Sequence, residues 1–293
     1  RNEIREEFTR SREIKERGML AKFDSRLPFQ LTRGQENVWR EIKEDLSRSH
    51  PMYRLLQGDV GSGKTIIALR AMLAIVDSGG QAALLAPTEV LAQQHYANFI
   101  RLLGDLAQGG MLGGDALGTQ VALLTGSVVG TERTARLNVI HSGEAGIVVG
   151  THALLSEGVE FKDLALIVVD EQHRFGVEQR DALRMKAKLP PHLLVMTATP
   201  IPRTVAMTIF GDLDISTLRQ LPSGRSPIAT HVIAVLEKPK YLERAWERIK
   251  EEVAKGHQAY VVAPRISDNS ETKVKFSERD LAIAKLMGDS LED

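Results

Sequence analysis

The chain contains the string Gly58-Asp59-Val60-Gly61-Ser62-Gly63-Lys64-Thr65, which fits the pattern G-x-x-x-x-G-K-[ST] at every fixed position. An apolar run from Tyr53 to Leu56 precedes the string, and a long apolar helical pattern begins at Thr65. Glycines allow successive backbone N–H groups to surround phosphate oxygens, and the N-terminus of a following helix adds positive potential. Lys64 can reach the β- and γ-phosphates, and the Thr65 hydroxyl can bind Mg²⁺. The string predicts that the chain binds a nucleoside triphosphate.

Two neighbouring carboxylates form a second set of residues that could take part in catalysis. Asp170 and Glu171 follow directly on the apolar run Leu164–Val169. An apolar strand that ends in two acids, downstream of a phosphate-binding loop, is typical of the second half of a nucleotide-hydrolysing site. We expect Asp170 to hold Mg²⁺ and Glu171 to orient and deprotonate the attacking water.

Short polar motifs follow the neighbouring apolar runs. They are Thr88 within Ala86-Pro87-Thr88-Glu89, Thr125-Gly126, Thr151-His152 after Gly150, and Thr197-Ala198-Thr199. Each motif is weak alone, because any loop can carry Thr and Gly. Their order at successive strand ends, together with the Asp-Glu pair, is a strong pattern.

These motifs require elements that bring them together. The predicted strands are Leu55-Leu56, Ala82–Ala86, Val121–Leu124, Gly146–Val149, Leu164–Val169 and Leu193–Thr197. Several are apolar throughout, as strands buried on both faces of a parallel sheet should be. Helical patterns alternate with them, so we predict a doubly wound α/β domain with its ligand at the carboxyl ends of the strands.

The chain is expected to contain more than this one domain. Residues 1–27 are rich in Arg and Glu and predict a solvated helical lead-in from an upstream domain, residues 28–221 form the α/β domain, and residues 222–227 form a linker. Residues 228–293 predict the start of a second α/β domain, with a strand at 228–235, an amphipathic helix that ends at Gly256, and a strand at 258–264.

A glycine-rich stretch between Leu103 and Thr119 interrupts the alternating pattern of the first domain. It has no hydrophobic period, so we expect a flexible surface loop there.

Composition excludes several classes of protein. Without cysteine the chain can form neither disulfides nor a cysteine-based zinc site, and we expect a cytoplasmic protein with no membrane contact. The 38 basic residues balance the 38 acidic ones, so a broad electrostatic platform for nucleic acid is not expected. Any DNA contact must rely on local clusters.

Over nearly all of residues 27–265 these strings resemble a superfamily-2 helicase. The resemblance implies a RecA-like first motor lobe and the beginning of a second RecA-like lobe. Phe29-Gln30-Leu31-Thr32 with Gln35 is similar to the family's adenine-reading motif. It implies that Gln35 contacts the base edge with Phe29 packed nearby, so that the nucleotide is ATP with Mg²⁺.

The resemblance also implies a set of residues that couple nucleotide state to DNA. They are Thr88, Thr125, Gly126, Thr151, His152, Gln172, His173, Arg174, Thr197, Thr199 and Arg203. His173 could instead be a metal ligand, but no second His or Cys lies at ligand spacing.

Within this superfamily the chain is most similar to the helicases of branched DNA. The supporting strings are Asp170-Glu171-Gln172-His173-Arg174-Phe175-Gly176, Thr197-Ala198-Thr199-Pro200 and Gly224-Arg225-x-Pro227. They imply a monomeric, bacterial, nucleoid-associated enzyme that uses ATP to regress forks and migrate four-way junctions in recombination and repair. Transcription-repair coupling factors are the nearest alternative, although they usually have Glu where this chain has Gln172. A nucleotide switch that moves along no DNA is the third possibility.

Two parts of the family pattern are not found in this sequence. They are the N-terminal wedge domain and the arginine-bearing motif of the second lobe. We therefore expect the isolated chain to bind ATP and Mg²⁺ but to hydrolyse ATP weakly or not at all.

Overall fold

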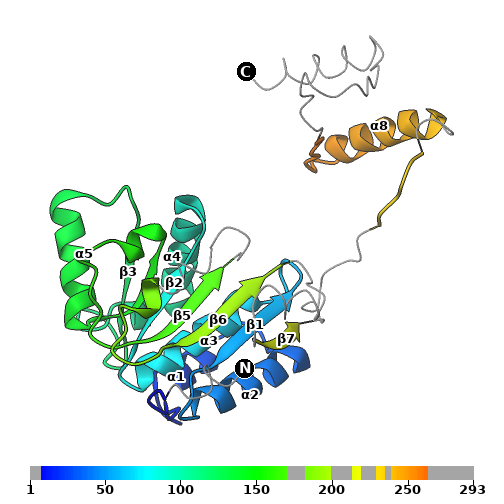
Figure 1. The fold of residues 1–293 in the computed structure, drawn as a ribbon. Helices are drawn as coiled ribbons and strands as arrows, with labels where there is room; N and C mark the ends of the chain where they lie inside the picture. Colours follow the sequence, from blue (N-terminus) through cyan, green and yellow to red (C-terminus); the bar gives the residue numbers. More distant parts are fainter. Residues whose placement is uncertain (1–7, 171–181, 199–212, 219–228, 235–238, 263–293) are drawn as a thin grey trace. The chain divides into compact units, whose positions relative to one another are not determined.

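Seven parallel strands form one sheet in the first part of the chain, counted over the residues that the structure describes (Figure 1). The computed structural model describes residues 8–170, 182–198, 213–218, 229–234 and 239–262. The strands are β1 (Tyr53–Gly58), β2 (Gln81–Leu85), β3 (Gln120–Leu124), β4 (Ala145–Gly150), β5 (Leu164–Asp170), β6 (His192–Thr197) and β7 (Asp214–Leu218). Their order is β3-β4-β2-β5-β6-β1-β7. The predicted parallel α/β fold is confirmed, together with the six strands predicted for this domain.

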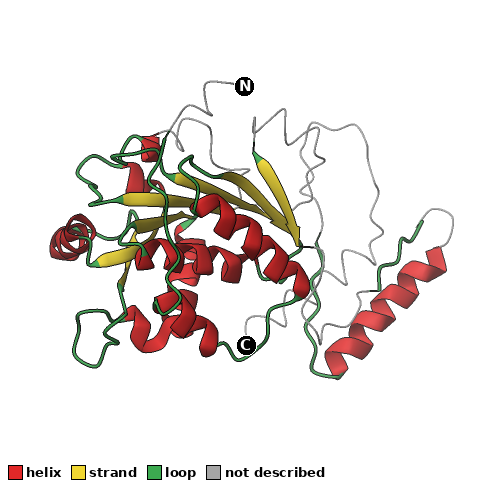
Figure 2. Ribbon diagram, turned by 90° about the horizontal axis from the view of Figure 1, so that it is seen from below, coloured by secondary structure: helices red, strands yellow, loops and turns green. Residues whose placement is uncertain are grey.

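Helices cover both faces of this sheet, as a doubly wound fold requires (Figure 2). Among the described residues of the first unit they include α1 (Met19–Ser25), α2 (Arg33–Leu46), α3 (Lys64–Asp77), α4 (Glu89–Leu103) and α5 (Gly130–Ser142), with the 3₁₀ helices η2 (Gly104–Ala107) and η3 (His152–Leu155). Buried residues of α1 to α4 pack on one face, and those of α5 and η3 pack on the other.

Two apolar clusters follow from the alternation of side chains along the strands. Leu56 of β1 belongs to the cluster around α3, whereas its neighbour Leu55 belongs to the cluster on the opposite face. α3 is buried from Ile67 to Ile75 because it lies centrally under the sheet, which explains its apolar residues on all sides. The helix that begins at the phosphate-binding loop is therefore a rigid part of the core.

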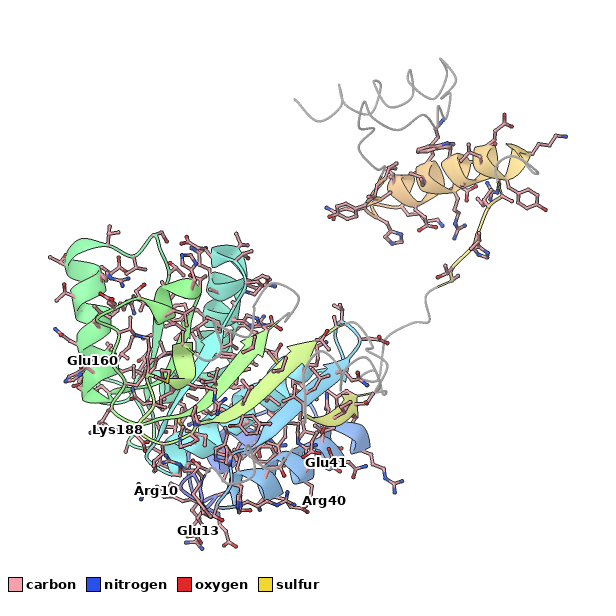
Figure 3. All side chains as sticks on the ribbon, viewed as in Figure 1. Arg10, Glu13, Arg40, Glu41, Glu160 and Lys188 are labelled. Atoms are coloured by element: carbon pink, nitrogen blue, oxygen red, sulfur yellow. The ribbon has the colours of Figure 1, made fainter. Side chains whose placement is uncertain are left out.

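A partly buried ion-pair cluster fixes α2 to the strand that leads into the phosphate-binding loop. Arg54 of β1 lies in the core and pairs with Asp45 and Glu41 of α2, at nitrogen–oxygen distances of 2.7 and 3.1 Å. Glu41 is one of the charged side chains labelled in Figure 3. Because α2 carries Gln35 in its first turn, this cluster also helps to place Gln35 beside the loop.

Residues 18–26 differ from the solvated lead-in that the sequence predicts. α1 buries Met19, Leu20 and Phe23 in the core, and the backbone N–H groups of Met19 and Leu20 donate to the Asp77 carboxylate at 2.7 and 3.0 Å. The surrounding Arg and Glu residues mask three apolar side chains at helical spacing. The expectation of solvation is wrong for this segment, and its origin in an upstream domain stays a prediction.

The glycine-rich stretch between Leu103 and Thr119 is also more ordered than a free surface loop. It begins with the turn of η2, whose Leu106 is fully buried. Further along, Asp115 pairs with Lys22 and with Arg26 of the α1 segment. Local periodicity cannot reveal these anchors, because each of them joins residues far apart in the chain.

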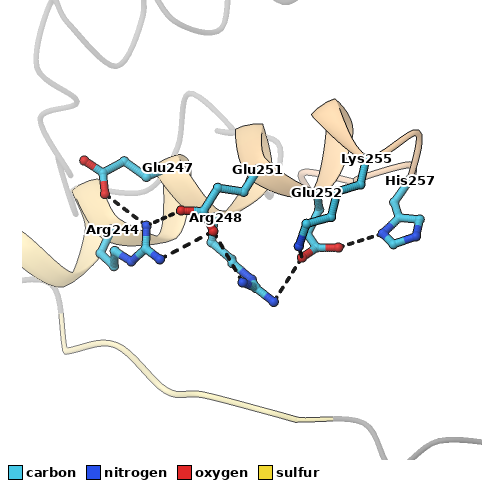
Figure 4. A network of polar contacts seen from close by, with 7 residues as sticks. All are labelled: Arg244, Glu247, Arg248, Glu251, Glu252, Lys255 and His257. Carbon is cyan, nitrogen blue, oxygen red and sulfur yellow. Dashed lines mark hydrogen bonds and ion pairs between the residues drawn. The ribbon is translucent and has the colours of Figure 1, made fainter.

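The chain divides into two compact units, Arg1–Ser226 and Pro227–Asp293, and the division lies inside the segment predicted as a linker. The second unit contains α8 (Pro239–Ala254), which confirms the predicted amphipathic helix. Its polar side chains form the network of Figure 4, which consists of Arg244, Glu247, Arg248, Glu251, Glu252, Lys255 and His257. Contacts with His257 and Lys255 lower the pKa of Glu252 to about 2.

The two strands predicted beside α8 are wrong for the residues that can be compared. Residues 229–234 and 257–262 are described, and neither segment is a strand. A strand needs a neighbour that pairs with its backbone groups, and the described part of this unit offers none to either segment.

Candidate nucleotide-binding site

The phosphate-binding loop connects β1 directly to α3. β1 ends at Gly58 and α3 begins at Lys64, with Gly63 as the residue before the helix. Gly61 and Gly63 have φ values of 80° and 90°, in the left-handed region that favours glycine. The loop therefore has the strand, glycine turn and helix arrangement that directs backbone N–H groups at a phosphate.

Lys64 lies folded over this loop. Its Nζ donates to the carbonyl oxygens of Gly58 and Asp59 at 2.5 and 3.0 Å. An ammonium group carries three hydrogens on a flexible stem, so it can exchange these carbonyls for phosphate oxygens without a change of backbone. Ser62 Oγ is buried and has no hydrogen-bond partner among the described residues, so one further polar atom of the loop is available to a ligand.

Gln35 lies against the loop rather than apart from it. The residue is almost fully buried, and its Nε2 donates to the Ser62 carbonyl oxygen at 2.9 Å. Its Oε1 accepts from the Thr32 N–H at 2.9 Å, while Thr32 Oγ1 accepts from the Gln35 N–H at 3.2 Å. This reciprocal pair is a capping box at the start of α2. A Cβ on Gly63 would lie 2.2 Å from Gln35 Nε2, so the fit requires glycine there.

The predicted adenine contact of Gln35 stays a prediction. The structure shows that its amide already supports the loop through Ser62 and caps α2 through Thr32. Phe29, predicted to pack beside the base, is 45% exposed just before the same helix. An exposed aromatic ring there is suited to stacking on a flat ligand.

Asp170 lies at the carboxyl end of β5, the same end of the sheet as the phosphate-binding loop. It is the last residue of β5 and is in register with Met196 of β6, which pairs in turn with Leu56 of β1. One strand therefore separates β5 from β1, and at about 5 Å between neighbouring strands the two ends are about 10 Å apart. That spacing leaves room for terminal phosphates and a cation between the loop and the carboxylate.

His95 is a functional candidate that the sequence did not indicate. It lies on α4, and its Nε2 is 2.6 Å from Asp170 Oδ2. Both side chains are mostly buried, with 12% and 14% of their surface exposed. A single histidine on a helix gives no local signal, because its partner lies 75 residues further along the chain.

The polar motifs at the other strand ends form a connected rim. Thr88 caps α4 by accepting from the Leu91 N–H at 3.3 Å, and Glu89 Oε1 accepts from the Ser127 N–H at 3.1 Å. Thr125 is buried and shares a hydrogen bond with Ser127 at 2.9 Å.

The rim continues at the end of β4. Thr151 is buried and accepts from the Ala153 N–H, while the adjacent His152 is exposed, as is Gly126 in the neighbouring loop. Thr197, at the end of β6, is fully buried. Coupling of these residues to DNA stays a prediction.

Several predicted site residues lie outside the described residues. They are Glu171, Gln172, His173, Arg174, Thr199 and Arg203. Their roles stay predictions. Asp170 and Ala198 are the last described residues before these segments; Asp170 ends β5, and Ala198 directly follows the end of the adjacent β6, at the end of the strands that carries the loop.

The residues present fit a nucleotide with a divalent cation. The loop offers backbone N–H groups, a lysine and the first turn of α3 with Thr65. Asp170 offers Oδ1, which has no hydrogen bond within the described part of the chain. Mg²⁺ in such sites is usually held by one or two protein oxygens together with phosphates and water. Thr65 and Asp170 are the residues that would hold it.

Comparison with known sequences decides the family. The DEAD/DEAH box helicase family matches residues 32–208, which is more than half of the chain. This chain belongs to the DEAD/DEAH box helicase family. The match begins at Thr32, in the capping box, and runs through the phosphate-binding loop and Asp170, so it includes both halves of the site described above.

Among curated proteins, this DEAD/DEAH box chain is similar to ATP-dependent DNA helicases named RecG. It is 58% identical over 273 residues to RecG of Mycobacterium bovis, covering 92% of this chain and 37% of that protein. It is 46% identical over 262 residues to RecG of Aquifex aeolicus, covering 89% of this chain and 31% of that protein. The chain therefore spans about a third of the length of the curated relatives it matches.

Solved structures agree with these matches. A structure of RecG bound to a three-way DNA junction aligns with a TM-score of 0.72 and 36% identity, covering 87% of this chain and 32% of that one. In the sequence, Gln172 and its neighbouring strings favoured the branched-DNA helicases over the coupling factors. The RecG matches confirm the resemblance to the branched-DNA helicases. The DEAD-box helicase Mss116, at 20% identity and a TM-score of 0.52, shares the fold. Among the described residues, no helix has the length and apolar character needed to cross a bilayer.

Proposed function

We propose that this chain is the ATP-binding motor lobe of a DNA helicase that acts on branched DNA, such as forks and four-way junctions, in recombination and repair. The observation that carries the proposal is the shared sheet edge, where the phosphate-binding loop faces Asp170 across β6. The identity to RecG helicases supports the choice of DNA as substrate. The enzyme is proposed to be monomeric, cytoplasmic and nucleoid-associated.

In this proposal each residue of the site has one task. Lys64 leaves the Gly58 and Asp59 carbonyl oxygens and turns toward the β- and γ-phosphates. Thr65 and Asp170 would hold Mg²⁺, which would neutralise charge that develops on the transferred phosphoryl group. Glu171 follows Asp170 in the chain and takes the proton of the attacking water.

The adenine base is proposed to lie between Phe29 and the first turn of α2. Gln35 would then read the base edge while its amide stays bonded to Ser62 and Thr32, because an amide has two hydrogens and its oxygen has two lone pairs. Gln35 would then both bind the base and hold the phosphate-binding loop in its conformation.

Coupling to DNA is proposed to pass through the rim at the carboxyl ends of the strands. The residues proposed for this coupling are Thr88, Thr125, Gly126, Thr151, His152, Gln172, His173, Arg174, Thr197, Thr199 and Arg203. The hydrogen bond between Glu89 and Ser127 already ties the loops after β2 and β3 together. A movement of either loop would therefore affect the other.

The test is the ATPase rate of the full-length protein that contains this chain, measured with forked DNA, with plain duplex and without DNA. We expect the largest rate with forks and loss of all turnover in Glu171→Gln. Equal stimulation by plain duplex would favour a coupling-factor type of translocase. Nucleotide binding without any effect of DNA would favour a switch module and overturn the helicase proposal.

A further inference from the structure

His95 and Asp170 make a close side-chain contact that the proposed roles above leave unexplained. His95 Nε2 lies 2.6 Å from Asp170 Oδ2. An ionised carboxylate can only accept hydrogen bonds, so the Nε2–H group of His95 is the donor. The contact occupies one oxygen of the carboxylate and leaves Oδ1 for another partner.

The position of His95 is fixed by the packing of α4. Ala92 and Phe99 of the same helix are fully buried under the sheet, and the rings of His95 and Phe99 have centroids 6.2 Å apart. The first turn of α4 is held by the bond between Glu89 and Ser127. A donor on such a rigid element restricts rotation of the Asp170 side chain more than solvent water would.

Restricted rotation matters because Asp170 is the only described residue at the end of β5 that can offer a negatively charged ligand to a cation beside the phosphate-binding loop. Carboxylates that bind metals are usually held by an outer hydrogen-bond partner, and loss of such a partner typically costs about 10- to 100-fold in metal affinity or activity. The His95–Asp170 pair has the geometry of this arrangement.

We propose that His95 is a positioning residue that holds Asp170 with Oδ1 directed at the divalent cation of the nucleotide. The proposal rests on the function proposed above, because it assumes that Asp170 binds the cation that accompanies ATP. His95 itself touches neither the cation nor the nucleotide. Its effect is on the affinity for the metal, and not on the affinity for nucleotide alone.

Three substitutions separate positioning from packing. His95→Gln retains an N–H donor at nearly the reach of Nε2, whereas His95→Asn has a similar amide on a shorter stem that cannot reach Asp170. Gln94→Asn places asparagine at the neighbouring exposed position of α4, so it reports the cost of asparagine in this helix. All three variants keep a polar, uncharged side chain.

The experiment titrates Mn²⁺ into the 293-residue chain in the presence of a non-hydrolysable ATP analogue and measures bound metal by electron paramagnetic resonance. A second titration measures the analogue alone, without metal. We expect His95→Asn to weaken Mn²⁺ by about 10- to 100-fold and to leave metal-free analogue affinity unchanged. His95→Gln and Gln94→Asn should stay close to the unmodified chain.

Mn²⁺ affinity in His95→Asn equal to that of the unmodified chain would overturn the proposal. An equal loss of metal-free analogue binding would overturn it too, since that result indicates general damage to the site. If thermal melting shows that His95→Asn does not fold, His95→Met takes its place, because it fills similar volume without a donor. Absence of metal-dependent analogue binding in the unmodified chain would instead refute the proposed function itself.

Discussion

Acidification should destabilise the first unit through one buried histidine. His192 is the first residue of β6, so it lies at the amino ends of the strands, opposite to the nucleotide site. Its side chain is fully buried. Its Nδ1 accepts from the Met52 N–H at 2.9 Å, so the neutral ring carries its proton on Nε2, which has no partner among the described residues. Burial, and then the nearby charge of Arg12, lower the pKa of His192 from 6.5 to about 4.

The sign of the effect follows from this lowered pKa. The unfolded chain takes up the proton as the pH falls through 6.5, whereas the folded chain resists it until about pH 4. The free energy of unfolding is therefore highest above pH 6.5 and is lost as the pH falls toward 4. The full difference corresponds to about 3 kcal/mol, of which about 2 kcal/mol is already lost at pH 5.

The assay is urea unfolding between pH 7.5 and 4.5, followed by Trp39 fluorescence in a Trp246→Phe background so that only the first unit reports. His192→Asn keeps an acceptor for the Met52 N–H but cannot titrate. We expect this variant to be less stable at neutral pH, because it is smaller, and to lose about 2 kcal/mol less than the parent between pH 7.5 and pH 5. The exposed His141→Asn should follow the parent. Parallel pH profiles for His192→Asn and the parent would refute the reasoning.

Three further substitutions test the nucleotide site. Lys64→Ala should abolish productive binding of ATP and Mg²⁺ in calorimetry, because it removes the charge that faces the β- and γ-phosphates; unchanged affinity would contradict that role. Glu171→Gln should bind ATP normally in the full-length protein but lose turnover, since an amide cannot take the proton. Gln35→Ala should weaken ATP more than GTP and also lower the melting temperature, because Ser62 and Thr32 lose partners worth about 1 kcal/mol each. An equal fall for both nucleotides would leave Gln35 only its supporting role.

The sheet was predictable to the extent that its strands are buried on both faces. β2, β4, β5 and β6 are apolar runs, and such runs identify central parallel strands. β7 was missed because Asp214–Leu218 is half polar. It is the edge strand beside β1, and its buried Ser216 accepts a hydrogen bond from Arg54. Its assignment depends on that long-range contact.

In the candidate site, too, the features encoded by neighbouring residues were predictable and those that depend on long-range contacts were not. The phosphate-binding loop could be predicted because its function depends on local backbone geometry, which is determined by residues adjacent in the sequence. The hydrogen bonds that hold the loop and Asp170 in place could not be predicted, because each of them joins residues far apart in the sequence. Gln35 holds the loop from 27 residues away, and His95 holds Asp170 from 75 residues away. The capping-box spacing of Thr32 and Gln35 gives one partial signal, since it places Gln35 in the first turn of α2.

These supports explain how a loop rich in glycine can bind tightly. Glycine makes the turn possible but leaves the unbound loop many conformations, and ordering them costs free energy on binding. Here Gln35 donates to the Ser62 carbonyl, and Lys64 donates to the Gly58 and Asp59 carbonyls. The loop is therefore arranged before a phosphate arrives. Binding energy that would be spent on ordering remains for the contacts of Lys64 and the α3 N-terminus, and Gln35 links that arrangement to the place where a base would lie.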